Sequence, residues 1–452
     1  MTRVESVFLG VARMPFVLLF LVPGLAIVGA AGQSGGLSPS LPLVHVDNGP
    51  NSAGAQARNY VVVVSLRGFR WDYAKRENAA HLLALARQGS WAPEGMVPSY
   101  PALSFADGYT IASGLYPGHH GIVSDEFLDT DTQKRFSISD PAAVRDGTWY
   151  SGTPLWSLAE REGMRTACLF WPGSEAKIAG FRPTWYADSQ AKLKSTAALQ
   201  QARVDDVLVL LRLPAEQRPH LIFMSFEEPE IEAVQYGPNA AQTRAAELGM
   251  DALIGKLKGA LDATKLPIDL VVVSEHGFAQ VQDGWITLDQ LADLQGFDTK
   301  SNLLYAQNEQ DRVRVYERLK KASSQFMVYR RKNAPADLNI SQNARAGDPV
   351  IIATGPFAIR ARMPASGQID QPPSAGLGGF DARKAPETKA SFFAAGPDIV
   401  KGKTVAPFED VNLYPWLAHI LGLAPGKNDG NLNILAGTLR DGGSNPADET
   451  GH

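Results

Sequence analysis

Three stretches of the chain are almost continuously apolar over the length of a β-strand. They span residues 60–66 (YVVVVSL), 220–226 (HLIFMSF) and 268–274 (IDLVVVS). None of them alternates regularly between apolar and polar positions, as a strand with one solvent-exposed face would. The pattern therefore predicts three strands that are buried on both faces, which is typical of a parallel sheet.

Segments with a helical pattern accompany these predicted strands. They occupy the neighbourhoods of residues 79–88, 205–213 and 245–261. Alternation of strands and helices predicts an α/β/α sandwich around a mostly parallel central sheet. Because ligands of such sheets bind beyond the carboxyl ends of the strands, the residues that follow each apolar run are the candidates for chemistry.

The N-terminus has the composition of an export signal. Arg3 and Arg13 supply positive charge, residues 16–28 form an apolar run, and small residues follow it. This order predicts a signal peptide over residues 1–31 and a periplasmic or secreted protein. An uncleaved membrane anchor is the alternative, but the run is shorter than the roughly 20 residues that a membrane span needs.

The rest of the chain divides by composition. We expect a flexible polar linker, one α/β domain with an inserted cap-like segment of weaker pattern, and a disordered polar tail. In order, these are residues 32–58, residues 59–440 with the cap at 283–364, and residues 441–452.

Composition excludes several classes of protein. The 452 residues include 43 Lys and Arg against 47 Asp and Glu, a formal net charge of −4, so no excess of basic residues indicates a nucleic-acid polymer as partner. The single cysteine, Cys168, excludes an internal disulfide framework and any Cys-rich metal site. There are only eight histidines, which limits the histidine-based metal sites that the chain can build.

Polar residues that could take part in catalysis or binding follow the predicted strands. Arg67 follows the first run, a cluster of carboxylates at 227–232 follows the second, and Glu275 and His276 follow the third. Ser104 lies after a proline-rich loop and before a predicted helix, where its hydroxyl would be either a helix cap or a nucleophile. A solvated loop and an isolated strand-end pair are the simpler interpretations of the two acidic segments.

Several sequence blocks together resemble one family. The chain is similar to the nucleotide pyrophosphatase/phosphodiesterase family of the alkaline phosphatase superfamily, in its bacterial exported branch, from about residue 59 to residue 440. The blocks are VVVVSLRGFRWDY (61–73), GYTIASGLYPGHHGIV (108–123), ISDPAAVRDGTWYSGTPLW (138–156), LFWPGSEA (169–176), VVVSEHGF (271–278) and APFEDVNLYPWLAHILGLAPGKNDGNL (406–432).

This resemblance implies two zinc ions beside a threonine or serine nucleophile, held by six Asp and His ligands. Two metals at such a spacing polarise a phosphate and activate the attacking and leaving oxygens. The nucleophile position is Ser104 here. Asp107 stands in the phosphate pocket, where the family has a neutral asparagine.

The ligand positions of the first zinc ion are largely changed. The resemblance implies an aspartate, a histidine four residues later and a distant histidine, and these positions hold Glu230, Val234 and Gly378. Valine and glycine offer no side-chain donor to a metal. We therefore expect this zinc site to be lost.

The second zinc ion would be held by an aspartate after the first strand, by the nucleophile and by an adjacent Asp-His pair. These positions hold Arg67, Ser104, Glu275 and His276. A guanidinium cannot lose its proton to become a ligand, and its charge repels a cation. Glutamate moves a carboxylate by about 1.5 Å, beyond the roughly 0.2 Å that metal–ligand distances tolerate.

These substitutions suggest how the site is balanced without metal. We expect Arg67 to form a network with the carboxylates of Asp107, Glu230 and Glu275 in place of the two cations. The remnant ligands Glu230, Glu275 and His276 leave room for one metal at most, and no cofactor is the primary expectation.

Two functions follow from this interpretation. The first is an inactive or strongly altered homologue that binds a nucleotide or another phosphoester, with a membrane as partner only if the signal is not cleaved. The alternative is an active phosphodiesterase or phosphatase that uses Ser104 as nucleophile, with one metal or none, and His276 as its base.

Overall fold

A central sheet of nine strands organises the computed structural model, which describes residues 41–187, 196–366, 368–370 and 372–440. Its middle five strands, β7, β6, β8, β2 and β9, are parallel, whereas β1, β18 and β3 pair antiparallel with their inner neighbours. This confirms the predicted mostly parallel α/β fold. In sheet order the strands are β1 (Leu43–His45), β7 (Trp185–Ala187), β6 (Thr166–Leu169), β8 (Leu221–Phe226), β2 (Tyr60–Leu66), β9 (Ile268–Val273), β18 (Phe392–Ala395), β3 (Ser90–Trp91) and β19 (Lys403–Thr404).

The central strand β2 explains why the apolar runs do not alternate. Val61 and Val63 belong to the hydrophobic core on one face of the sheet, and Val62 and Val64 belong to the core on the other face. Side chains of successive strand residues point to opposite faces. Because helices cover both faces, every position of β2 is buried and an apolar residue is favoured at each.

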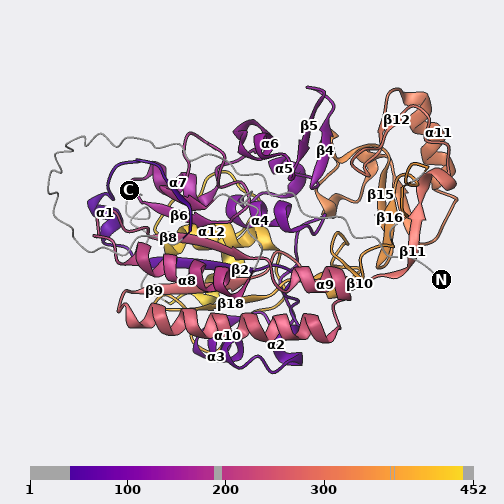
Figure 1. Ribbon diagram of the computed structural model, residues 1–452. Helices are drawn as coiled ribbons and strands as arrows, with labels where there is room; N and C mark the ends of the chain where they lie inside the picture. Colours follow the sequence, from indigo (N-terminus) through magenta and orange to yellow (C-terminus); the bar gives the residue numbers. More distant parts are fainter. Residues whose placement is uncertain (1–40, 188–195, 367, 371, 441–452) are drawn as a thin grey trace, which may run out of the picture. The chain divides into compact units, whose positions relative to one another are not determined.

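Helices pack against both faces of the sheet (Figure 1). One core contains residues of α4 (Ser104–Ser113), α7 (Leu155–Arg161) and α12 (Leu413–Ile420). The other contains residues of α3 (Ala80–Gln88), α8 (Ala197–Leu211) and α10 (Ala241–Ala263). The expected helices near 79–88 and 245–261 therefore correspond to α3 and α10. Helix α8 begins earlier than expected because the side chain of Thr196 accepts a hydrogen bond from the backbone of Leu199 and caps the helix there.

The prediction of a flexible linker over residues 32–58 is wrong for the second half of that segment. Strand β1 pairs antiparallel with β7 at the sheet edge, and a short helix, α1 (Ala53–Gln56), follows it. The backbone N–H of Leu41 also donates to the carboxylate of Asp206 at 2.8 Å. Polar and glycine-rich composition predicted mobility here, but pairing with an open strand edge and specific hydrogen bonds hold the segment in place.

The segment between residues 283 and 364 builds a hydrophobic cluster of its own. Its buried members run from Leu288 to Ala361. Here β11 (Gln282–Thr287) pairs with β16 (Phe357–Arg360), β14 (Phe326–Tyr329) pairs with β15 (Val350–Ala353), and α11 (Glu309–Leu319) packs beside them (Figure 1). Its role as a cap stays a prediction.

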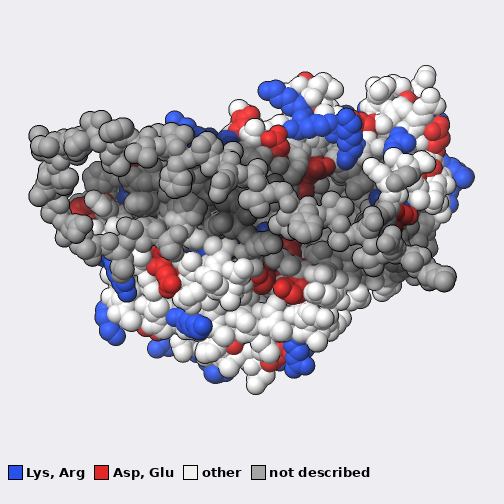
Figure 2. Space-filling model, viewed as in Figure 1, with Lys and Arg blue, Asp and Glu red and all other residues white. Residues whose placement is uncertain are grey.

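The described part of the chain contains no helix that is both long and apolar enough to span a bilayer. The predicted signal peptide at 1–31 and the predicted tail at 441–452 lie outside the described residues. On the described surface of the face shown in Figure 2, Lys and Arg side chains occur together with Asp and Glu, as expected for a chain with net charge −4.

Candidate active site

The carboxyl ends of three neighbouring strands bring the predicted site residues together. Arg67 follows β2, Glu230 begins helix α9 (Glu230–Tyr236) after β8, and Glu275 and His276 follow β9. Strand β2 pairs in parallel register with both β8 and β9, so the three strands end at one edge. Ser104, the first residue of α4, completes the group.

The hydroxyl of Ser104 is the centre of the site. Its Oγ lies 3.1 Å from both carboxylate oxygens of Glu230 and 3.1 Å from Nε2 of His276. The cap alternative for Ser104 is wrong, because Leu103 occupies the N-cap position and Ser104 is already helical. The hydroxyl is therefore free to interact with the strand-end residues.

The ring of His276 is in the form that can accept a hydrogen bond from Ser104 through Nε2. Its Nδ1 lies 2.8 Å from the carbonyl oxygen of Gly277, and because a carbonyl oxygen only accepts, Nδ1 carries the hydrogen. Burial lowers the pKa of His276, which favours the neutral ring. Nε2 then holds a lone pair that can accept the Ser104 hydroxyl proton.

A partly buried ion pair lies at the end of the first strand. Arg67 Nε lies 2.6 Å from Oε2 of Glu230, and about a third of the Arg67 side chain (34%) stays open to solvent. Burial by itself would lower the pKa of Arg67, but the carboxylates of Glu230 and Glu275 raise it overall. Arg67 is therefore a permanent positive charge between two acidic groups.

Glu275 is fully buried on the other side of Arg67. Burial raises its pKa to about 7, although the nearby Arg67 guanidinium acts to lower it. Neither of its carboxylate oxygens has a hydrogen-bond partner that meets ordinary geometry. Near neutral pH this side chain is thus divided between its acid and its carboxylate form.

Asp107 does not join the network as expected. It lies one turn along α4, completely buried, and both its carboxylate oxygens lack a hydrogen-bond partner. Burial and the nearby carboxylates of Asp410 and Glu275 raise its pKa well above 3.8, which favours the neutral acid. The expected pairing with Arg67 is not formed, since neither carboxylate oxygen of Asp107 has a hydrogen-bond partner among the described residues.

Val234 and Gly378 lie beside this group without donating to it. Val234 uses its backbone carbonyl to accept a hydrogen bond from Ala375 at 3.0 Å. A Cβ atom on Gly378 would lie only 2.7 Å from Cε1 of His276 and 2.8 Å from the carbonyl oxygen of Ala102. No larger side chain fits at position 378 unless His276 moves.

The residues present do not match a pair of zinc ions. Among the described residues, no group of three or more His, Cys, Asp or Glu side chains is arranged to hold a metal ion. The carboxylate of Glu230 is instead paired with the guanidinium of Arg67 at 2.6 Å. The donor set of Glu230, Glu275 and His276 therefore lacks both the number and the spacing that a two-zinc site requires.

Sequence reasoning missed Asp125. Burial and the neighbouring carboxylate of Glu230 raise its pKa to about 6, while Arg67 acts in the opposite direction. It lies two residues after the recognised block at 108–123, just before the hairpin of β4 (Glu126–Asp129) and β5 (Lys134–Ser137). An isolated aspartate in a loop carries no periodic or strand-end signal, so only its position beside that block could have suggested it.

A small, mostly apolar cavity of about 170 Å³ lies beside Ser104. Leu103, the neighbour of Ser104, and Gly379, the neighbour of Gly378, both line it, together with Tyr100 and Val350. An apolar cavity next to a charged group can hold a ligand that has one flat or apolar part and one anionic part.

The sheet, its helices and this strand-end site are those of a phosphodiesterase-type α/β fold. The structure is similar to that of murine ectonucleotide pyrophosphatase/phosphodiesterase 5, with a TM-score of 0.77, 25% sequence identity, and coverage of 84% of this chain and 100% of that chain. An inactive variant of the mouse protein in complex with AMP shares the fold, with a TM-score of 0.77 and 24% identity over 85% of this chain and 100% of that chain.

Sequence comparison agrees with the fold. The model of the type I phosphodiesterase/nucleotide pyrophosphatase family matches residues 61–367. An uncharacterised pyrophosphatase/phosphodiesterase of Schizosaccharomyces pombe is 32% identical over 394 residues, which cover 82% of this chain and 78% of that protein. The chain belongs to this family. Its bacterial origin stays a prediction.

Other relatives differ in length. Human ectonucleotide pyrophosphatase/phosphodiesterase family member 7 is 27% identical, over 87% of this chain and 86% of that protein. A venom phosphodiesterase of Crotalus durissus collilineatus is 27% identical over 84% of this chain, but the match covers only 46% of the venom protein. The chain thus spans about half the length of that venom enzyme.

The raised pKa of Glu275 predicts how stability depends on pH. The native state keeps a proton on Glu275 up to about pH 7, whereas the unfolded chain releases it near 4.5. The contribution of Glu275 to the free energy of unfolding is therefore complete below its pKa in the unfolded chain. It is lost as pH rises through its pKa in the folded protein, and the loss amounts to up to about 3 kcal/mol. Glu275→Gln, which stays neutral, should reduce the loss of unfolding free energy between about pH 5 and pH 8 in urea titrations.

The exposed substitution Glu317→Gln is the matched control, since it removes the same charge from the surface of α11. It should leave the pH dependence as in the unmodified protein. A Glu275→Gln variant that loses as much stability as the unmodified protein over this range would contradict the charge state derived for the site.

Proposed function

We propose that this protein is an exported, zinc-independent homologue that binds a nucleotide or a similar phosphoester without hydrolysing it by the two-zinc route. The observation that carries this proposal is the ion pair between Arg67 and Glu230 at 2.6 Å. It places a fixed cation at the first strand end, where the family resemblance implies a zinc ligand. A permanent positive charge there disfavours a second cation and favours an anionic ligand.

Arg67 supplies the anion-binding group in this proposal. Its side chain is partly open to solvent, and guanidinium groups bind phosphate oxygens through two parallel hydrogen bonds. The raised pKa values of Asp107 and Glu275 reduce the negative charge that a phosphate would meet. The ligand's phosphate would then lie beside Arg67 and near the start of α4, whose first backbone N–H groups also favour anions.

The apolar cavity beside Ser104 would hold the other part of the ligand. Leu103 and Gly379, which precede Ser104 and follow Gly378 in the chain, line this cavity, and Tyr100 offers an aromatic side chain on its wall. The murine homologue that shares the fold has been solved with AMP. A nucleoside monophosphate is therefore our candidate ligand.

Loss of hydrolysis follows from what the site lacks. In the two-zinc mechanism, metal ions lower the pKa of the attacking group and neutralise charge on the phosphate. Here the carboxylate of Glu230 lies 3.1 Å from Ser104 Oγ and would repel an approaching phosphate oxygen. The second step also needs a base for water, and His276, the imidazole that contacts Ser104 among the described residues, would have to serve in both steps.

Export is part of the proposal. The charged and apolar pattern of residues 1–31 supports a signal peptide. Two of the similar proteins carry names that place them outside the cell, the human ectoenzyme and the snake venom protein.

Binding of AMP to chelator-treated protein tests this function. We expect isothermal titration calorimetry to give saturable binding that added EDTA does not weaken, with no release of adenosine. Arg67→Ala should weaken binding about 10-fold or more, since a charge-assisted hydrogen bond contributes roughly 1.5–3 kcal/mol. Arg212→Ala, an exposed arginine after α8, is the control and should bind normally. Equal binding by the Arg67→Ala variant, or AMP cleavage by the metal-free protein, would reject the proposal.

A serine hydrolase that works without metal is the second candidate. It is favoured by the 3.1 Å contact between Ser104 Oγ and Nε2 of His276, whose ring is held in the accepting form. In this case His276 takes the proton of Ser104 as the hydroxyl oxygen forms a bond to phosphorus, and the bond from phosphorus to the ester oxygen breaks so that the alcohol part of the substrate leaves. We place it second because of the carboxylate of Glu230 beside the nucleophile.

Turnover of bis-p-nitrophenyl phosphate by chelator-treated protein tests the second candidate. If it is correct, Ser104→Ala abolishes turnover, because the nucleophile is removed, while the exposed Ser151→Ala leaves it unchanged. Turnover that survives in the Ser104→Ala variant comes from another source and rejects this candidate, as does the absence of any turnover.

A further inference from the structure

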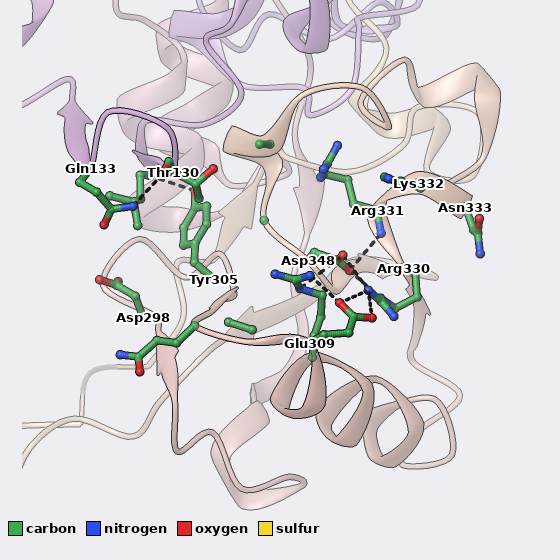
Figure 3. Close-up of a pocket in the computed structure, with 16 residues that line it drawn as sticks. Thr130, Gln133, Asp298, Tyr305, Glu309, Arg330, Arg331, Lys332, Asn333 and Asp348 are labelled. Atoms are coloured by element: carbon green, nitrogen blue, oxygen red, sulfur yellow. Dashed lines mark hydrogen bonds and ion pairs between the residues drawn. The ribbon is translucent and has the colours of Figure 1, made fainter.

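A large polar cavity lies apart from the site around Ser104. Its volume is about 830 Å³, and the hairpin of β4 and β5 forms one wall while the segment from Asp298 to Asp348 forms the others (Figure 3). It shares no lining residue with the small apolar cavity beside Ser104. Any ligand it holds is thus bound independently of Arg67.

Two of its four basic side chains are already neutralised. Arg330 makes an ion pair with Asp348, Nε to Oδ1 at 3.1 Å, and a second with Glu309 at 2.9 Å. Arg312 contacts the same Glu309 at 2.6 Å. Figure 3 shows Glu309, Arg330 and Asp348 grouped on one side of the cavity. The remaining acid on the wall, Asp298, pairs with Arg135.

The other two basic side chains have no carboxylate partner within the described chain. Arg331 donates from its guanidinium to the carbonyl oxygen of Ser341 and from its backbone N–H to Asp348. Lys332, the next residue, is exposed, and no ion pair engages it among the described residues. Both belong to the single-turn helix η3 (Arg331–Asn333) at the cavity wall. The four basic and three acidic lining side chains leave the wall with a net positive charge, and Arg331 and Lys332 are the cations that no carboxylate of the described chain pairs with.

The other polar side chains of the wall can form hydrogen bonds with the hydroxyl groups of a ligand. Thr130 and Gln133 lie on the hairpin side (Figure 3). Gln307 and Asn333 add amide groups to the lining. Such groups donate and accept hydrogen bonds at several points, as sugar hydroxyls require. The one aromatic side chain, Tyr305, is 5% exposed, and its hydroxyl already bonds Leu128 and Arg345, so no open ring is available to stack on a nucleobase.

We propose that this cavity binds an anionic sugar, a hydroxyl-rich ligand that carries a phosphate or carboxylate group. The anionic group lies against Arg331 and Lys332. The hydroxyls contact the amides and the ion-paired Glu309–Arg330–Asp348 group, whose charges are held in place by one another.

Calorimetry with glucose 6-phosphate, glucuronate, glucose and inorganic phosphate tests this site. We expect glucose 6-phosphate or glucuronate to bind saturably. Glucose and inorganic phosphate should each bind about 10-fold more weakly or worse, because glucose lacks the anionic group and inorganic phosphate lacks the sugar hydroxyls. Glucose 6-phosphate alone would assign a sugar phosphate, and glucuronate alone a sugar acid. Equal affinity for glucose, equal affinity for inorganic phosphate, or no saturation by either anionic sugar at about 10 mM would overturn the proposal.

Variants locate the binding. The double variant Arg331→Gln/Lys332→Gln should lower affinity about 10-fold or more, and Lys332→Gln alone, which leaves the bond from Arg331 to Ser341 intact, should give part of that loss. Lys256→Gln, an exposed lysine of α10, is the control. Undiminished binding by both Lys332 variants would also overturn the proposal. Arg67→Ala should bind the sugar normally, so that failure here is distinct from failure of AMP binding.

Discussion

The rest of the site depends on one cation at the end of strand β2. Arg67 pairs with Glu230 at 2.6 Å, and its charge also acts on Glu275 and Asp125. Buried carboxylates are costly unless a positive group is close to them. In this protein Arg67, a side chain of the fold itself, supplies such a positive group beside Glu230.

The remaining substitutions are consistent with this arrangement. Gly378 leaves no space for a further imidazole beside His276, and Val234 contributes its backbone to a loop contact rather than a donor to the site. Asp107 and Glu275 have raised pKa values, so part of the negative charge is removed by protonation rather than by pairing. The site thus combines one guanidinium with carboxyl groups of raised pKa, and this combination is the basis of the proposed anion binding.

The sheet and the grouping of the strand-end residues could be predicted from the sequence, for a physical reason. The continuous apolar runs require strands buried on both faces, and parallel strands end at one edge, so Arg67, Glu230 and His276 had to be neighbours. What could not be predicted depends on contacts between distant parts of the chain: Asp125 acts on the site from a loop, and the charges that act on Asp107 include the carboxylates of Asp410 and Glu275. Contacts of this kind join distant parts of the chain and leave no periodic signal.

The zinc content of the purified mature protein tests the central claim most directly. The protein would be incubated with zinc, freed of excess metal and measured by elemental analysis. If the ion pair of Arg67 and Glu230 replaces the metal pair, zinc should stay below about 0.1 per chain. Close to two zinc ions per chain would contradict the account, because Arg67 would then have to leave the strand end and a complete ligand set would have to form around it.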